Sequence, residues 1–190
     1  MITYEQLKEE LSRAHSPTER RLHFAVLLAK AGGVSTDEFI VVGGSAIEFY
    51  TSGQYTSGDI DIVETASVSW KKILSEWRFK VQGRIWYSED LAIVVDFVTP
   101  PYTYDVSRTQ VLVTAHGSLR IAAIEDLLIK RLQSAKFWKR PAELEQAKLL
   151  AVLHWERIDW AYVQDLAARF DVADLLTNLT EAVSKARPRP

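Results

Sequence analysis

The chain has 190 residues, a formal net charge of -2 and no cysteine. This length suffices for one domain with a buried core, or for a core with a small appendage. The lack of cysteine excludes disulfides, thiol nucleophiles and cysteine-bound zinc, and the charge argues against nucleic-acid binding over the whole surface. Because the N-terminal residues have no signal-peptide core and no apolar run is long enough to cross a bilayer, we expect a cytoplasmic protein without membrane contact.

The N-terminal part alternates helical and extended patterns. Helices are predicted over 4–12 and 17–30, the second because Ser16 offers an N-cap and Pro17 suits the first helical position. Short β-branched runs predict strands, and glycines or polar loops separate them from the helices. The other elements predicted here are strands over 38–42 and 59–63, helices over 45–50 and 67–77, a hairpin of 84–87 with 91–98, and two short strands within 109–122.

The C-terminal part has helical patterns throughout, with a proline and a polar stretch at the expected breaks. The helices predicted there cover 124–138, 142–154, 160–170 and 173–186. We therefore predict an α/β (α+β) chain with two parts. Residues 1–123 form an α/β core that includes the N-terminal helices, and residues 124–190 form a helical C-terminal subdomain.

Three acidic residues in extended segments are the candidate metal ligands. Asp59 and Asp61 are two apart on a strand, so they share one face and repel each other unless a cation lies between them. Oxygen ligands of this kind suit Mg²⁺ or Mn²⁺. In the alternative interpretation, Asp59 caps a turn and Asp61 pairs with a surface lysine. Asp96 interrupts the apolar run 93–98, and it requires a partner, either a metal shared with the other two or an arginine such as Arg84.

A glycine turn is the second candidate feature. Gly43 and Gly44 follow the predicted strand 38–42, and without a Cβ they let the backbone turn sharply and approach a ligand closely. The start of the next helix offers N–H groups and a dipole that attract phosphate. Gly43, Gly44 and Ser45 are therefore candidate nucleotide-binding residues, with the Ser45 hydroxyl as a further donor. The alternative is an ordinary strand-to-helix turn with Ser45 as the N-cap.

Together, Val42-Gly43-Gly44, Asp59-Ile60-Asp61 and Asp96 resemble the signature of the DNA polymerase β-like nucleotidyltransferase superfamily. The resemblance covers residues 38–150, and within the superfamily the chain looks like a prokaryotic branch of unassigned nucleotidyltransferases that is similar to the AbiEii and MenT toxins. The resemblance implies a nucleotidyltransferase-like mixed sheet flanked by helices. It also implies transfer of NMP from an NTP to a hydroxyl of RNA such as tRNA, of a protein or of a small molecule. A toxin would have an antitoxin partner, and the alternative is a catalytically inactive nucleotide- or partner-binding module.

The same resemblance assigns roles to individual residues. Asp59 and Asp61 would hold the nucleotide-bound metal, and Asp96 would help to hold the metal that activates the acceptor hydroxyl. Both metals would be Mg²⁺ or Mn²⁺. Lys130 stands where such toxins often have a lysine that reaches the nucleotide phosphates. Relatives often have an arginine shortly before the aspartate pair, where this chain has residues 54–57, and a later aspartate pair, where this chain has Glu143 and Glu145.

A basic stretch with two aromatic residues follows Lys130. Phe137 and Trp138 lie among the cations Lys130, Arg131, Lys136, Lys139 and Arg140. Such a stretch can receive RNA by phosphate contact and base stacking. The alternative is a solvated helix face with Trp138 in the core.

Overall fold

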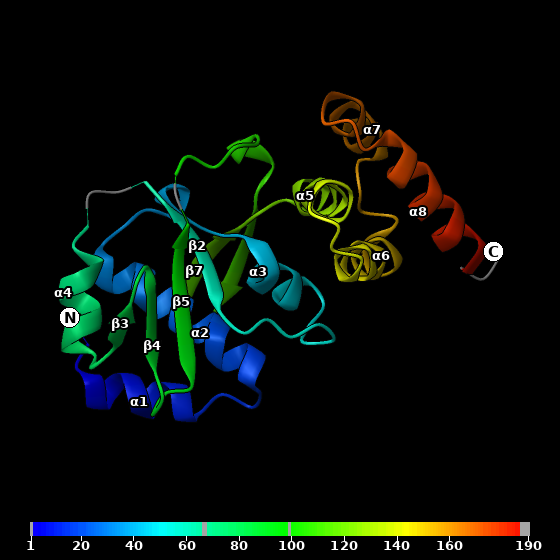
Figure 1. Ribbon diagram of the computed structural model, residues 1–190. Coiled ribbons are helices and arrows are strands. Elements are labelled where there is room, and N and C mark those ends of the chain that lie inside the picture. Colours follow the sequence, from blue (N-terminus) through cyan, green and yellow to red (C-terminus); the bar gives the residue numbers. More distant parts are fainter. Residues whose placement is uncertain (1, 66–67, 99, 187–190) are drawn as a thin grey trace. The chain divides into compact units, whose positions relative to one another are not determined.

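The computed structural model describes residues 2–65, 68–98 and 100–186 of the chain (Figure 1). The chain divides into two compact units, Met1–Ala122 and Ala123–Pro190. All strands of the described residues belong to the first unit, and the second unit is helical. Across those described residues, none of the helices combines the length and the apolar character that a bilayer crossing requires.

The first unit is built on a seven-stranded mixed sheet with the order β3-β4-β5-β2-β1-β7-β6. The pairs β2–β5 and β1–β7 are parallel, whereas β1–β2, β3–β4, β4–β5 and β6–β7 are antiparallel. The strands are β1 (Phe39–Val41), β2 (Ile60–Glu64), β3 (Lys80–Gln82), β4 (Ile85–Ser88), β5 (Ile93–Val98), β6 (Gln110–Thr114) and β7 (Gly117–Ile121).

The strand register places two of the acidic residues side by side. In the parallel pair β2–β5, Asp61 lies opposite Asp96 and Ile60 lies opposite Val95. Side chains alternate between the two faces of a sheet, so the aspartates share one face and the buried Ile60 and Val95 share the other. The apolar positions of the central strands thereby form the core, and the acidic positions remain together.

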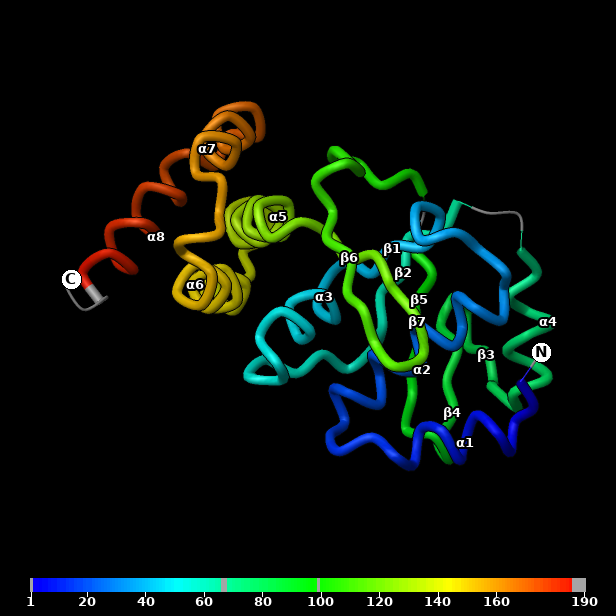
Figure 2. The backbone as a smooth tube through the Cα atoms, turned by 180° about the vertical axis from the view of Figure 1, so that it is seen from behind, coloured from blue at the N-terminus to red at the C-terminus, as the bar shows by residue number. Residues whose placement is uncertain are grey.

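Among the described residues of the first unit, four α-helices accompany the sheet, namely α1 (Tyr4–Ser12), α2 (Pro17–Gly32), α3 (Gly43–Tyr50) and α4 (Trp70–Glu76). Two short 3-10 helices, η1 (Thr36–Glu38) and η2 (Val106–Arg108), lie in the loops. Helix α2 packs on β7 and contacts α1, as the view from behind shows (Figure 2). Its buried side includes Phe24 and Leu28. The predicted start of α2 is confirmed, because the Ser16 hydroxyl accepts a hydrogen bond from the N–H of Glu19 and Pro17 is the first helical residue.

Several element bounds differ from the prediction. Helix α3 begins at Gly43, two residues earlier than expected, with Val42 as the N-cap. Helix α4 begins at Trp70 with Ser69 as the N-cap, and Ser67, the predicted first residue of this helix, lies outside the described residues. Strand β3 was not predicted from the sequence. It is a three-residue edge strand whose residues are all exposed, so it has no apolar alternation to mark it.

The second unit contains α5 (Ile124–Phe137), α6 (Ala142–His154), α7 (Trp160–Arg169) and α8 (Ala173–Ala186). Helix α5 packs against α6 and α7 and buries Leu128 and Leu132. Trp138, just after α5, is 58% exposed, so the alternative that places it in the core is wrong. The predicted fold class is confirmed: a mixed sheet with flanking helices is followed by a helical C-terminal part.

Candidate functional site

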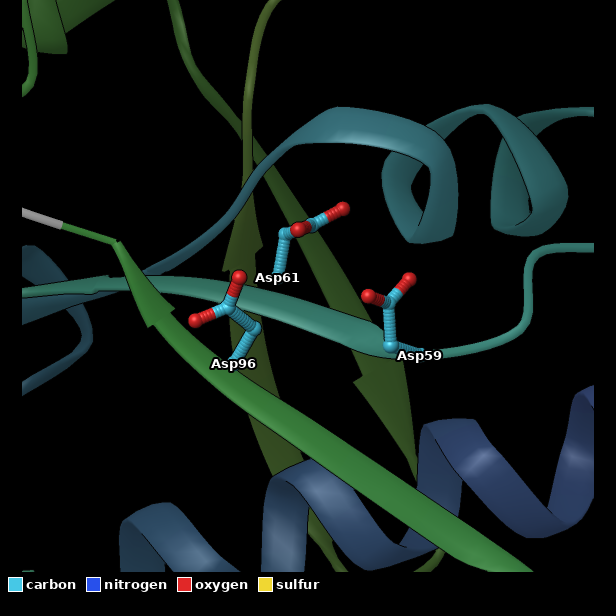
Figure 3. A group of neighbouring side chains, drawn as sticks. All are labelled: Asp59, Asp61 and Asp96. Carbon is cyan, nitrogen blue, oxygen red and sulfur yellow. The ribbon is translucent and has the colours of Figure 1, made fainter. Parts of the chain in front are cut away.

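Three carboxylates converge on one face of the sheet. Asp61 lies on β2, Asp59 immediately precedes that strand, and Asp96 lies on the neighbouring β5 (Figure 3). One carboxylate oxygen from each residue lies within 4.8 Å of the other two. Asp59 and Asp61 point to the same face because they are two residues apart, and Asp96 joins them because it lies opposite Asp61 in the parallel pair. Three carboxylates so close together repel one another unless positive charge lies among them.

Asp96 is the most deeply buried of the three, at 4% exposure. Its Oδ2 forms an ion pair with Arg84 at 2.8 Å, so the arginine weighed as an alternative partner does contact it. The Arg84 side chain is 70% exposed, however, and an ion pair with so exposed a partner stabilises little. The other oxygen, Oδ1, is buried and has no hydrogen-bond partner among the described residues.

A buried carboxylate oxygen without a donor is costly, which makes the Oδ1 atom of Asp96 informative about a ligand. A hard divalent cation binds carboxylate oxygens and supplies the missing positive charge. The three aspartates offer oxygens close enough to share one such ion. The residues present therefore fit Mg²⁺ or Mn²⁺. The contact of Arg84 with Oδ2 of Asp96 leaves the other oxygen of that carboxylate available to the cation.

The glycine turn is in direct contact with this acidic group. The N–H of Gly44 donates to Oδ2 of Asp61 at 3.1 Å. Gly43 has φ of 61°, and a Cβ added there would overlap the Asp61 carboxylate. A Cβ at Gly44 would lie 2.7 Å from the Ser57 hydroxyl oxygen. Both glycines are thus required by the close approach of other side chains, and the first also by its left-handed backbone.

Ser45 differs from both sequence interpretations. It is not the N-cap of α3, a position that Val42 occupies. Its side chain is fully buried, and its hydroxyl donates to the carbonyl of Val42 and accepts from the N–H of Asp61, both at 3.0 Å. The hydroxyl has one proton, and the Val42 carbonyl already receives it. The side chain therefore connects the start of α3 to β2, and its hydroxyl proton is not available to a phosphate.

Lys130 belongs to the second unit. It is exposed on α5, and its ammonium group lies 5.9 Å from the centre of the Trp138 ring. The later acidic residues of this unit form ion pairs: Glu143 with Arg131 at 2.7 Å and Glu145 with Lys148 at 2.7 Å. Lys130 is thus a cation on the helix surface that lies next to an aromatic ring.

The basic stretch around Phe137 and Trp138 is open to solvent in part. The two rings are 51% and 58% exposed and meet edge to face, with centroids 6.5 Å apart. Lys136 pairs with Asp174 at 3.0 Å. Half-exposed aromatic rings beside cations are compatible with base stacking.

Sequence reasoning did not identify Ser57 and Glu48. The Ser57 hydroxyl donates to Oδ1 of Asp59 at 3.2 Å, and the Ser57 N–H donates to Oε2 of Glu48 at 2.8 Å. Glu48 is fully buried. The signal that could have revealed it is a charged residue directly after the apolar Ala46-Ile47 of the predicted helix, because a buried charge requires a partner.

No family model matches the sequence, and no curated protein matches it either. A solved structure does match: the crystal structure of the nucleotidyltransferase ANT(2")-Ia in complex with adenylyl-2"-tobramycin, with a TM-score of 0.53 and 16% sequence identity. The match covers 79% of this chain and 94% of that chain. The fold is similar to a nucleotidyltransferase fold. The predicted nucleotidyltransferase-like fold is thus confirmed.

Proposed function

We propose that this chain is a metal-dependent nucleotidyltransferase that moves NMP from an NTP to a hydroxyl group and releases pyrophosphate. Two observations on Asp96 support this most strongly. Its buried Oδ1 has no hydrogen-bond partner among the described residues, and one of its carboxylate oxygens lies within 4.8 Å of an oxygen from each of Asp59 and Asp61. A structural cluster of acids would expose its carboxylates or pair them fully. The similarity to a nucleotidyltransferase fold supports the same reaction class.

In this proposal Asp59, Asp61 and Asp96 hold Mg²⁺ or Mn²⁺. A bound divalent cation supplies charge neutralisation at the phosphates and lowers the pKa of the acceptor hydroxyl. Besides holding the metal through Oδ1, Asp96 would accept the proton of that hydroxyl with its carboxylate. The aspartates would thereby align the two reactants, which is the main contribution a protein makes to phosphoryl chemistry.

The phosphates would meet the start of α3. Gly43, Gly44 and Ser45 form its first turn, whose main-chain N–H groups have no acceptor inside the helix; the Gly44 N–H donates to Oδ2 of Asp61 instead. Together with the helix dipole they attract anions. Lys130 would neutralise phosphate charge, as in the toxins that the sequence resembles.

The acceptor and the biological role are further parts of the proposal. The complex of ANT(2")-Ia with adenylyl-2"-tobramycin supports an ATP donor and a small-molecule hydroxyl as one acceptor class. The resemblance of residues 38–150 to AbiEii and MenT toxins supports RNA such as tRNA, or a protein, as the acceptor. It also supports a growth-arresting role in the cytoplasm with an antitoxin as partner.

One assay tests the reaction. The full chain is incubated with each NTP labelled at the α-phosphate, with Mg²⁺ or Mn²⁺, and with total RNA, a protein extract or aminoglycosides. Asp61→Asn preserves the shape of the side chain and an oxygen for the Gly44 N–H, and Glu64→Gln removes an acid from the same strand outside the cluster. Label transfer that Asp61→Asn abolishes and Glu64→Gln retains supports the proposal. Transfer that survives Asp61→Asn contradicts it.

One observation favours the alternative, a nucleotide- or partner-binding module without turnover. The Arg84 guanidinium contacts Oδ2 of Asp96 and supplies part of the positive charge that a metal would bring. In that case the chain binds nucleotide in the same assay and transfers no label with any acceptor. A chain that binds neither metal nor nucleotide excludes both functions.

A further inference from the structure

A fully buried carboxylate lies behind the acidic cluster. Glu48 of α3 has 0% exposure, and its two oxygens accept hydrogen bonds from three residues in two segments of the first unit, helix α2 and the loop before β2. Arg21 of α2 donates from Nε at 3.1 and 3.2 Å and also from Nη2, and the Thr18 hydroxyl donates at 2.6 Å. The main-chain N–H of Ser57 donates at 2.8 Å. The carboxylate is therefore surrounded by donors, as a buried charge requires.

The contact with Ser57 reaches the loop that leads into β2. Besides the side-chain bond, the Glu48 carbonyl accepts from the N–H of Gly53 at 3.0 Å, so the same residue holds this loop at two points. Ser57 is 6% exposed. Its hydroxyl donates to Oδ1 of Asp59 at 3.2 Å. A continuous set of hydrogen bonds therefore leads from Arg21 through Glu48 and Ser57 to Asp59.

Asp59 needs such support more than the other two aspartates do. Asp61 and Asp96 lie within β2 and β5, where the parallel ladder fixes their backbones opposite each other. Asp59 precedes the first residue of β2 and lies outside that ladder. Its side chain is half-buried, at the end of the loop that Glu48 holds. Partners behind a metal ligand orient it, and their loss weakens metal binding.

We propose that Glu48, paired with Arg21, is a positioning residue that fixes Ser57 so that the Ser57 hydroxyl orients Asp59 for a divalent cation. The inference rests on the proposed function, because it takes Asp59 as a metal ligand. A buried ion pair contributes little net stability compared with an apolar pair of the same size. The Arg21–Glu48 pair therefore serves to set a geometry, and this geometry ends at the candidate metal site.

The first test removes only the last hydrogen bond. Affinity for Mn²⁺ is measured by titration calorimetry on the full chain and on three variants: Ser57→Ala, Ser57→Thr and Thr56→Ala. Ser57→Ala is expected to bind Mn²⁺ about tenfold more weakly, the effect typical of losing a residue that supports a metal ligand. Ser57→Thr retains the hydroxyl, and Thr56→Ala removes an exposed hydroxyl from the same loop, so both are expected to bind as the parent does.

The second test removes the buried pair. Arg21→Met with Glu48→Leu replaces both charges by apolar groups of similar size, a change that folded proteins tolerate. Thermal unfolding and circular dichroism establish that the double variant is folded. We expect an Mn²⁺ affinity about tenfold lower and faster hydrogen exchange at the Ser57 amide. Adding Ser57→Ala to this variant is expected to cost nothing further, because both changes break the same path.

The outcomes separate this inference from the proposed function. Should the parent chain bind Mn²⁺ and Ser57→Ala bind it equally well, the inference is overturned and the proposed function is retained. A folded double variant with unchanged affinity overturns it too, as does a fully additive loss in the combined variant. A parent chain that does not bind Mn²⁺ overturns the proposed function, and the inference with it.

Discussion

Gly43 lies so close to the Asp61 carboxylate that a Cβ at this position would overlap it. The aspartate and the turn were separate features in the sequence, and the fold brings them into contact. Gly33 has nearly the same backbone, with φ of 64° against 61° at Gly43, and a Cβ there would meet nothing within 4 Å. The two glycines therefore allow the effect of backbone strain to be separated from the effect of the contact with Asp61.

Gly33→Ala should cost about 1 kcal/mol of folding free energy, the usual cost of a left-handed backbone for a residue with a Cβ. Gly43→Ala should cost more, because it combines this strain with the overlap, and it should also lower Mn²⁺ affinity by moving Asp61. Urea unfolding and Mn²⁺ titration of both variants check this. Equal losses of stability with equal Mn²⁺ affinities would contradict the contact between Gly43 and Asp61.

Arg84 and a cation compete for Asp96. Arg84→Ala removes a positive group that contacts Oδ2, so we expect Mn²⁺ to bind about tenfold more tightly, in line with the loss of a unit charge a few ångströms away. In the absence of metal the same variant should lose no more than about 1 kcal/mol of stability, because the Arg84 side chain is 70% exposed. Titration calorimetry and unfolding measure the two effects.

Arg84→Lys provides the control for that change, because it retains the charge and loses the planar guanidinium. Its Mn²⁺ affinity should stay near that of the parent chain. If Arg84→Ala binds Mn²⁺ more weakly than the parent, Arg84 assists the cation instead of competing with it, and the prediction is wrong.

Removing the charge of Glu48 alone should lower the free energy of unfolding strongly. Glu48→Gln leaves the Arg21 guanidinium, whose side chain is 11% exposed, without a counter-charge. Breaking one side of a buried ion pair typically costs about 3–5 kcal/mol. The comparison variant is Glu9→Gln, which breaks the exposed pair with Arg13 and should leave the free energy of unfolding almost unchanged. Chemical denaturation measures the free energy of unfolding of both variants. If Glu48→Gln loses only a little stability, Arg21 finds another partner and the prediction is wrong.

Stability should fall in acid because of His23. Burial lowers the pKa of this imidazole below its ordinary value of 6.5, and the neighbouring His116, with ring centroids 4.6 Å apart, lowers the pKa further. Glu19 and Glu10 act in the opposite direction, and His15 lowers the pKa slightly. Below pH 6.5 the unfolded chain therefore takes up a proton that folded His23 does not, so the free energy of unfolding decreases as the pH falls.

Urea unfolding between pH 8 and pH 5 measures that slope, within the range where imidazoles titrate. His23→Gln should make the dependence shallower below pH 6.5, whereas the exposed His15→Gln should leave it nearly unchanged. Identical slopes in the parent chain and His23→Gln would assign the acid sensitivity to other groups.

The predictable parts of the fold are those that local rules decide. Ser16 and Pro17 marked the start of α2 because a cap and a first-turn proline act within a few residues. Strand β3 was missed because an exposed edge strand of three residues has no alternation. The parallel pairing of β2 with β5 was also beyond local rules, since it joins segments separated by a helix and a hairpin.

The candidate site divides in the same way. The shared face of Asp59 and Asp61 follows from a two-residue period. The direction of the Ser45 hydroxyl does not follow from any sequence period, because it depends on how near β2 lies to the start of α3. The pairing of Glu48 with Arg21 joins positions 27 residues apart on two helices, and no periodicity relates them. Contacts of this kind require the tertiary structure.

The Ser45 hydroxyl joins the carbonyl before α3 to the N–H of Asp61. The first turn of the helix and the strand with the aspartates are therefore locked to each other before any substrate arrives. Under the proposed function, the distance between phosphate donors and metal ligands would be built in, and an incoming nucleotide would spend none of its binding energy on assembling the centre. Broad acceptor tolerance could evolve around such a centre, because its spacing does not depend on which acceptor is bound.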